Sequence, residues 1–366
     1  MTLDERAGRA VAGIRRAVRP VERELGDSLE RFERFRDGRR RNQRFGVVAV
    51  VIALTVAVSV LVGRSFGVLE RQKPAEPPNA PVGVILFGDQ DGVNQLPHWY
   101  TVRPDGSHVV DLHVSATCAT WLPSDDRILI TNDATVGPGS PLRPAVVDPD
   151  GSALRPLDGV RNDALNLGCG DVSPDGLRIA IEGFSRARPE LNGIYSIRAS
   201  DGGDLVPLIK GPVSAPRYSP DGMRLAFVDS KPGVTPSGAG AVFVMNSDGS
   251  DPVRVTPWGY AFDIPSWSPD GQWIGFQKTY GEIWVVHPDG TALHRIPVDL
   301  PQGSGAASPS WSPDGAWIVF SLQRTNGAEI YRVRPDGTGL TRVAETPGGQ
   351  HDTPDWASAP KVRTTP

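Results

Sequence analysis

The sequence predicts an all-β fold, a six-bladed β-propeller of four-stranded antiparallel blades, preceded by an N-terminal cytoplasmic helical segment and one transmembrane helix. Three observations predict it: two motifs that alternate along most of the chain and one uncharged apolar stretch before them. The first motif recurs at intervals of 44–51 residues. Four strands in a repeat of this length are typical of a propeller blade.

The first motif is a Ser-Pro-Asp-Gly turn between two short strands, which we name a and b from the axis outward. Its plain copies are DVSPDGLRIAIEG from Asp171, RYSPDGMRLAFV from Arg217, SWSPDGQWIGFQ from Ser266 and SWSPDGAWIVFS from Ser310. A degenerate copy begins at Thr120 and a truncated one, DWAS, begins at Asp355. Proline fixes φ at the first central position of the turn, and glycine accepts the left-handed position that follows.

The second motif is an apolar strand that ends in an Asp-Gly turn, and it predicts strands c and d. Its aspartates, which we interpret as turn formers, are Asp105, Asp150, Asp201, Asp248, Asp289 and Asp336. This motif has six copies, against five turns between strands a and b. The first blade starts directly at Val84, and a strand a without its blade remains at 353–357. We therefore expect these two segments to pair and to close the ring, because closure removes exposed edges.

The repeated pattern WSPDG…I.F…IY…DG resembles the TolB-type β-propeller repeat, a relative of WD repeats, over about residues 82–357. The resemblance implies the fold. Propellers of this kind occur as interaction proteins of the cell envelope, as lids on peptidases and as surface domains, so the resemblance implies no single activity. TolB itself is soluble and periplasmic with a separate N-terminal domain, whereas this chain carries the sequence of a membrane anchor.

The uncharged stretch at 45–63, FGVVAVVIALTVAVSVLVG, predicts the transmembrane helix. At about 1.5 Å per residue it matches the thickness of a hydrocarbon core. Four arginines just before it (Arg39, Arg40, Arg41 and Arg44) place residues 1–44 in the cytoplasm and the propeller outside, as a single-pass protein of the cell membrane. A cleaved signal peptide is the alternative, but the long leader and the poor cleavage site favour a retained anchor.

Three further segments complete the predicted organisation. Residues 64–81 are a Pro-rich linker and residues 358–366 a disordered tail. Residues 7–36 carry an apolar stripe at helical spacing, interrupted at Pro20. This stripe is compatible with self-association, with an amphipathic helix on the inner leaflet or with docking of a cytoplasmic partner.

Charge is divided unevenly along the chain. The net charge is -4, and residues 1–44 contribute thirteen Arg against eight Asp and Glu, or +5, which leaves -9 for the remainder. A propeller with this balance is not expected to bind nucleic acid. No pattern of metal ligands or cofactor-binding residues stands out, so we expect neither a metal nor a cofactor.

Polar residues precede the large residue of each strand a, at positions where the neighbours are apolar, proline or small. They are Thr120, Asp171, Arg217, Ser266, Ser310 and Asp355. Strand a is the innermost strand of a blade, so these side chains are expected to line the axial channel. Asp263, His351 and Asp352 lie upstream on the same strands and are expected at one mouth. They form either a site for a ligand or partner, or only the solvated channel wall with an Asp171–Arg217 pair between blades.

Cys118 and Cys169 occupy equivalent positions in consecutive blades, three residues before the large residue of strand a. Innermost residues of neighbouring blades can approach within reach of a disulfide, and an oxidising exterior permits the bond. We therefore predict a disulfide between them. The alternative is two small buried residues that pack beside the channel.

The function that these features favour is non-catalytic: an extracytoplasmic propeller that binds or scaffolds an envelope protein or a small ligand at one face, with a possible relay to the cytoplasmic helix. The alternative is a propeller hydrolase or lyase that acts on envelope glycans or peptides. An enzyme would need ionisable groups that converge on one mouth of the channel.

Overall fold

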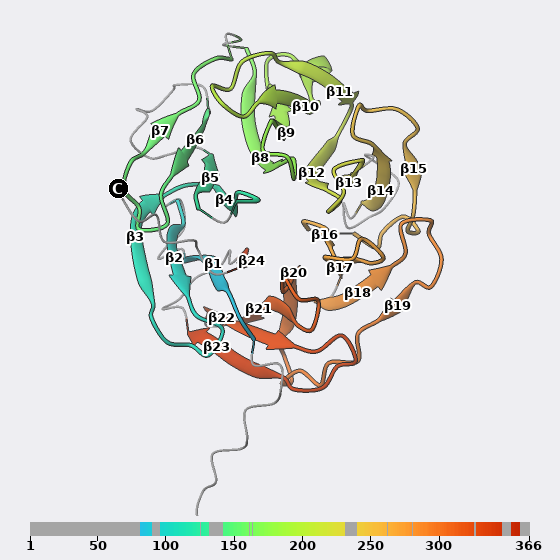
Figure 1. Ribbon diagram of the computed structural model, residues 1–366. Helices are drawn as coiled ribbons and strands as arrows, with labels where there is room; N and C mark the ends of the chain where they lie inside the picture. Colours follow the sequence, from blue (N-terminus) through green and yellow to red (C-terminus); the bar gives the residue numbers. More distant parts are fainter. Residues whose placement is uncertain are drawn as a thin grey trace, which may run out of the picture. The chain divides into compact units, whose positions relative to one another are not determined.

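The structure is a computed structural model that describes residues 81–89, 96–124, 126–131, 142–160, 162, 164–230, 240–261, 263–279, 281–325, 327–345 and 353–358. These residues form six four-stranded antiparallel sheets arranged as a ring (Figure 1). The prediction of an all-β six-bladed propeller is confirmed. The segments at 1–44 and 45–63 and the linker up to residue 80 lie outside the described residues. Among those described, no helix has the length and apolar character needed to cross a membrane.

The first half of the ring consists of three blades, whose strands follow one another from the axis outward. Blade 1 contains β24 (Asp355–Ala357), β1 (Val84–Asp89), β2 (His98–Val102) and β3 (Val110–Ser115). Blade 2 contains β4 (Cys118–Trp121), β5 (Ile128–Thr131), β6 (Pro144–Val147) and β7 (Arg155–Pro156). Blade 3 contains β8 (Asn166–Val172), β9 (Arg178–Phe184), β10 (Gly193–Arg198) and β11 (Val206–Lys210).

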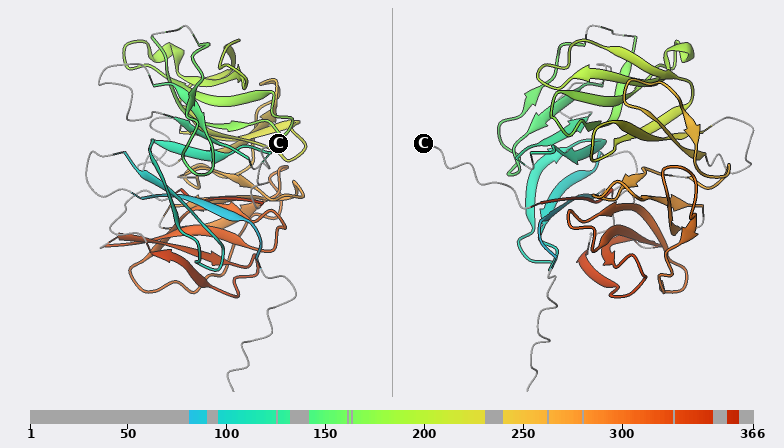
Figure 2. Two further views of the ribbon diagram at one scale, coloured as in Figure 1. Left: turned by 60° about the vertical axis from the view of Figure 1, so that its left-hand side comes forward. Right: turned by 45° about the vertical axis from the view of Figure 1, so that its right-hand side comes forward.

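The second half of the ring repeats the same order. Blade 4 contains β12 (Val213–Tyr218), β13 (Arg224–Asp229), β14 (Ala241–Asn246) and β15 (Val253–Arg254). Blade 5 contains β16 (Ser266–Trp267), β17 (Ile274–Lys278), β18 (Glu282–Val286) and β19 (His294–Arg295). Blade 6 contains β20 (Gly305–Trp311), β21 (Ile318–Arg324), β22 (Gly327–Val333) and β23 (Thr341–Glu345). The two turned views show the sheets side by side around the ring (Figure 2).

The ring closes where the last strand meets the first. β24 pairs antiparallel with β1, with Ile85 opposite Trp356 and Leu86 opposite Asp355. The indole Nε1 of Trp356 also donates to the carbonyl oxygen of Val82 at 3.0 Å. The expected pairing of the chain's two propeller ends is therefore confirmed, and strand a of blade 1 comes from the end of the sequence.

The Ser-Pro-Asp-Gly turns are held by their own side chains, as blade 5 shows. The Ser268 hydroxyl donates to Asp270 Oδ1 at 2.5 Å and accepts the Trp273 backbone N–H at 2.9 Å. Gly271 has a φ of 68°, in the left-handed region that favours glycine. The hydrogen bond from Ser268, with one from the Gln272 backbone, lowers the pKa of the Asp270 carboxyl. The aspartates of these turns therefore act as turn formers.

The hydrophobic core lies between the blades. Six clusters of buried side chains are present among the described residues, and each contains residues of two neighbouring blades. Strand b supplies a fully buried phenylalanine in three of the blades, at Phe227, Phe276 and Phe320. Because each blade buries its faces only against its neighbours, the blades depend on the closed ring for their stability.

Removing the tryptophan of the closing strand tests this dependence. Trp356 is 6% exposed and packs between blades 6 and 1. We expect Trp356→Ala to lower the free energy of unfolding by about 3–5 kcal/mol, measured by urea denaturation. Met223→Ala is the control, because Met223 is 69% exposed and its loss should change stability by about 0.5 kcal/mol or less. Equal effects of the two substitutions would contradict closure through β24.

Candidate functional site

The innermost strands of all six blades line an axial channel, and one end of it holds a cavity of about 400 Å³. The six polar residues that the sequence singled out on strand a all line this cavity: Thr120, Asp171, Arg217, Ser266, Ser310 and Asp355. The chain enters the ring at this end, because Val82 bonds to Trp356 and Ser358 lines the same cavity. Residues 81–83, where the described part of the propeller begins, therefore lie at the same end as this cavity.

Most of these polar side chains hold the next blade in place. Four of them accept a hydrogen bond from the backbone N–H of the large strand-a residue in the following blade. The donor–acceptor pairs are Tyr218 with Asp171 at 2.7 Å, Trp311 with Ser266 at 3.3 Å, Trp356 with Ser310 at 3.4 Å and Trp121 with Asp355 at 2.9 Å. The channel wall is thus a set of hydrogen bonds between blades, built from the same residues that face the cavity.

Asp355 joins three blades. Besides the Trp121 backbone N–H, its Oδ2 accepts the Thr120 hydroxyl at 2.8 Å, and its Oδ1 accepts the Ser310 hydroxyl at 3.4 Å. Thr120 belongs to blade 2 and Ser310 to blade 6, whereas Asp355 itself lies on the closing strand of blade 1. The short strand β24 therefore fastens the channel wall on both of its sides.

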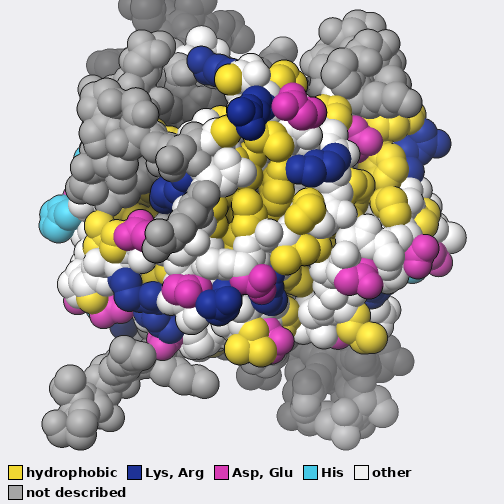
Figure 3. Space-filling view, turned by 90° about the horizontal axis from the view of Figure 1, so that it is seen from above, with side chains coloured by type: hydrophobic (Ala, Val, Ile, Leu, Met, Phe, Trp, Pro, Cys, Tyr) yellow, Lys and Arg dark blue, Asp and Glu magenta, His cyan; other side chains and the backbone are white. Residues whose placement is uncertain are grey.

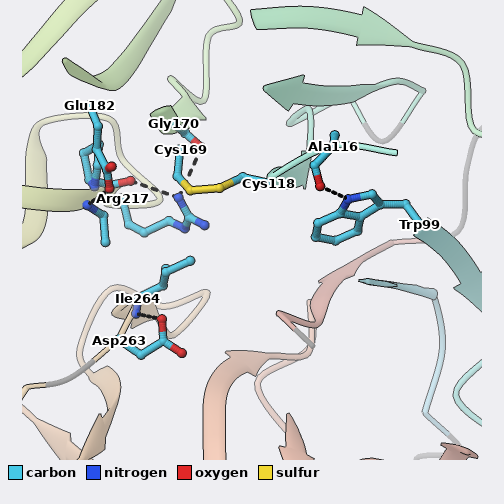
Figure 4. The surroundings of a disulfide bond; sticks show 11 residues. Trp99, Ala116, Cys118, Cys169, Gly170, Glu182, Arg217, Asp263 and Ile264 are labelled. Atoms are coloured by element: carbon cyan, nitrogen blue, oxygen red, sulfur yellow. Dashed lines mark hydrogen bonds between the residues drawn. A yellow bond between two sulfur atoms is a disulfide. The ribbon is translucent and has the colours of Figure 1, made fainter. Parts of the chain in front are cut away.

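Arg217 departs from this pattern because a guanidinium has no acceptor. Its Nη1 donates to the carbonyl oxygens of Gly170 and Pro216, at 3.2 and 3.0 Å (Figure 4). Among contacts between described residues, no hydrogen bond or ion pair joins Arg217 to Asp171, so the expected pair is not a direct contact. The next blade is held differently at this position: the Trp267 indole donates to the Arg217 carbonyl oxygen at 3.0 Å.

The carboxyl group of Asp171 has a strongly perturbed pKa. Burial raises its pKa to about 6, against the opposing effects of the Arg217 charge and the Tyr218 backbone N–H. The nearby charge of Asp355 raises it further. Asp171 therefore changes its ionisation close to neutral pH, unlike an ordinary aspartate. Burial, followed by the Asp171 charge, raises the pKa of the Tyr218 hydroxyl to about 12.

The opposite end of the strands holds a second cavity of about 480 Å³. Asp263 lines it, as expected for one mouth, and accepts the Ile264 backbone N–H at 2.8 Å and the Ser308 hydroxyl. His351 and Asp352, which were expected at the same mouth, lie outside the described residues. No group of three or more His, Cys, Asp or Glu that could hold a metal ion occurs in the described part of the chain.

A disulfide joins Cys118 on β4 to Cys169 on β8 at this second cavity (Figure 4). The two Cα atoms are 5.5 Å apart. The bond ties the innermost strands of blades 2 and 3, at the equivalent positions from which the sequence predicted it. It thus adds a covalent connection to the hydrogen bonds that hold neighbouring blades.

The sequence patterns did not single out Glu182, which also lines the second cavity. Its Oε1 accepts the Ala215 backbone N–H at 2.6 Å, and burial raises the pKa of its carboxyl group. Glu182 interrupts the apolar run of β9, which is the one sign of it in the sequence. Its contact with the next blade becomes visible only in three dimensions.

With its closed ring of four-stranded blades and polar channel, the chain has the fold of TolB-type propellers. It matches a structure assigned to TolB of Agrobacterium tumefaciens with a TM-score of 0.56 at 20% identity, over 74% of this chain and 91% of that one. TolB of Acinetobacter baumannii matches with a TM-score of 0.59 at 17% identity, over 76% of this chain and 67% of that one. A chain of a nidogen–laminin complex matches with a TM-score of 0.56 at 11% identity, over 76% of this chain and all of that one. At these identities the likeness shows the fold alone.

Sequence comparison adds two curated relatives. An uncharacterized protein of Agrobacterium fabrum is 30% identical over 196 residues, 51% of this chain and 64% of that protein. An uncharacterized peptidase of Bacillus subtilis is 36% identical over 67 residues, 18% of this chain and 10% of the peptidase. The chain thus spans a tenth of one relative and just under two thirds of the other. No family model matches the sequence.

The raised pKa of Asp171 predicts a pH-dependent stability. The folded chain holds this proton more tightly than the unfolded chain, so the stabilising contribution is complete below about pH 4 and is lost as the pH rises through about 6. Asp171→Asn keeps an oxygen for the Tyr218 N–H and removes the charge. We expect it to raise the free energy of unfolding at pH 7 by about 1–2 kcal/mol relative to wild type and to have little effect at pH 4.

Urea denaturation at both pH values measures this difference, with the exposed Asp251→Asn as the control. A variant that is equally stabilised or destabilised at pH 4 and pH 7 would show that Asp171 does not titrate between them.

The disulfide predicts a loss of stability on its removal. The cysteines are 51 residues apart in sequence, and opening a loop of this size costs about 4 kcal/mol in the chain-entropy model. We expect Cys118→Ser/Cys169→Ser to unfold at lower urea concentration than the oxidised wild type. Reduced wild type should match the double variant. If oxidised and reduced wild type unfold together, the bond does not constrain the ring.

Proposed function

We propose that this chain is a membrane-tethered binding or scaffolding module of the cell envelope, with its propeller outside the cytoplasm and its axial channel as the binding site. The single observation that carries the proposal is the cavity of about 400 Å³ to which all six blades contribute polar side chains. Concave sites with a few converging polar groups are where ligands bind. In this proposal, residues 45–63 are the tether, and residues 7–36 self-associate or relay binding to a cytoplasmic partner.

The bonding of the cavity residues favours binding over catalysis. Ser266, Ser310 and Asp355 accept backbone N–H groups of the next blade, so moving or consuming them would loosen the ring. The described lining of the two cavities contains no histidine that could activate a serine. These groups are better suited to hold a ligand in a rigid wall than to exchange protons with it.

One observation favours the alternative, a hydrolase or lyase that acts on envelope glycans or peptides. Glu182 lines the second cavity with a raised pKa, and Asp263 lies at the same mouth. A carboxyl group whose pKa is raised by burial holds its proton more tightly than an ordinary glutamate, as a general acid requires. In that case Glu182→Gln would abolish turnover of a glycan or peptide substrate without unfolding the protein.

Site-specific photocrosslinking in the native envelope tests the binding proposal. A photoreactive residue at Ser358 would sit on the cavity wall, where the Ser358 side chain is exposed and makes no hydrogen bond to another described residue. The same residue at Val253, on the outer strand β15 and 56% exposed, is the control. We expect a discrete adduct from position 358 and none from position 253.

Two results would contradict the proposal. The same adducts at both positions would show that the channel is not a distinct site. Turnover of envelope glycans or peptides that is lost in Glu182→Gln would make the protein an enzyme.

A further inference from the structure

The charged side chains that line the two cavities are unbalanced. Within the described chain they comprise four carboxylates and one guanidinium: Asp171 and Asp355 with Arg217 in the first cavity, and Glu182 and Asp263 in the second. One outer face of the propeller is different. Seen edge-on from the top of Figure 1, positive and negative side chains alternate around a hydrophobic strip, and neither sign dominates (Figure 3). The channel lining, unlike this face, therefore carries an excess of acidic side chains.

The hydrogen bonds of the channel do not neutralise this negative charge. Asp355 and Asp263 are bonded to hydroxyls and backbone N–H groups, which carry no net charge. Arg217 directs its Nη1 donor at two carbonyl oxygens. Its charge acts on both Asp171 and Glu182. One guanidinium near two acids offsets at most one of them, so the channel as a whole stays negative.

Two carboxylate oxygens are also poorly supplied with donors. Asp171 accepts the Tyr218 N–H through Oδ2, and beyond a weak effect of the adjacent Val172 N–H no described residue donates to its Oδ1. Glu182 accepts the Ala215 N–H through Oε1, and no described residue donates to its Oε2. Both residues are partly exposed, and neither oxygen is among the fully buried side-chain atoms that lack a hydrogen-bond partner. Each of these side chains therefore presents an acceptor with spare capacity to the cavity that it lines.

The first cavity is the better candidate for a cation site, because Asp171 and Asp355 both line it. The Asp355 charge is close enough to oppose ionisation of Asp171. A cation between them would relieve this repulsion and give Asp171 Oδ1 a strong donor. An ammonium offers three N–H donors and a guanidinium five. A bare metal ion fits less well, because the described residues contain no group of three acidic, His or Cys ligands.

We propose that the channel binds an organic cation, an ammonium or guanidinium group, between Asp171 and Asp355. The inference rests on the proposed binding function and names the chemistry of its ligand. The cation is either a Lys or Arg side chain of a partner protein or a free polyamine, which share this chemistry. The cavity volume accommodates one such group with part of its backbone or alkyl chain.

Calorimetric titration of the full-length chain, in mild detergent, low salt and pH 7, tests the inference. The probes are spermidine and a tripeptide Gly-Lys-Gly with both termini blocked, each compared with a matched uncharged form: fully acetylated spermidine and the Nε-acetyl-lysine peptide. We expect saturable binding of at least one charged probe and none of its acetylated form. Binding should weaken as salt is raised, because charge pairs are screened.

Matched variants locate the site. Asp171→Asn/Asp355→Asn removes two charges and keeps oxygens for the backbone N–H groups, so the ring should remain folded. We expect this variant to bind the charged probe at least about tenfold more weakly, equivalent to about 1.4 kcal/mol. Asp251→Asn/Asp299→Asn removes the same charge from exposed positions and should bind as wild type. Urea denaturation of both variants confirms that they are folded.

Three outcomes would overturn the inference: equal affinity for acetylated and charged probes, equal weakening in both double variants, or saturable binding of Mg²⁺ or Ca²⁺ with no binding of either amine. The crosslinking experiment at Ser358 shows whether only the cation inference fails or whether the proposed binding function fails as well. A channel adduct with a ligand that has no basic group would leave the binding function standing and remove the cation as its ligand class.

Discussion

The pairing of β24 with β1 is the interaction on which the rest of this structure depends. The blades bury their faces only against one another, so an open row of them would leave two apolar faces and two strand edges exposed. A strand of three residues closes the row. It places Trp356 in the core between blades 6 and 1, and it places Asp355 in the channel wall. One short segment thus completes both the hydrophobic core and the polar lining.

The polar side chains of the channel wall both connect neighbouring blades and line the cavity. Asp171, Ser266, Ser310 and Asp355 hold the next blade through its backbone N–H groups, and they face the cavity. A site built in this way is rigid, because its side chains are already fixed before a ligand arrives. The binding of a ligand and the closure of the ring are therefore physically connected. A fold shared with TolB proteins does not by itself assign an activity, so the function has to be argued from this site.

The fold could be predicted from the sequence because its determinants are local and repeated. Each Ser-Pro-Asp-Gly turn contains its own hydrogen bonds, and the surplus strand at 353–357 follows from counting turns. Channel-lining positions followed from their place on strand a. Contacts between blades could not be predicted in the same way. Arg217 bonds to carbonyl oxygens instead of Asp171, and Glu182 occupies a strand-b position where the other blades carry unrelated residues such as Val228 and Ser321.

Hydrogen exchange of the native full-length chain, followed by mass spectrometry, tests ring closure most directly. If β24 and β1 are paired, the backbone amides of residues 84–89 and 355–357 exchange only when the whole propeller unfolds. Their exchange should then be as slow as that of β13 in the middle of blade 4. Exchange of these two segments at the rate of exposed loops, while β13 remains protected, would show that the ring is open and would contradict closure through β24.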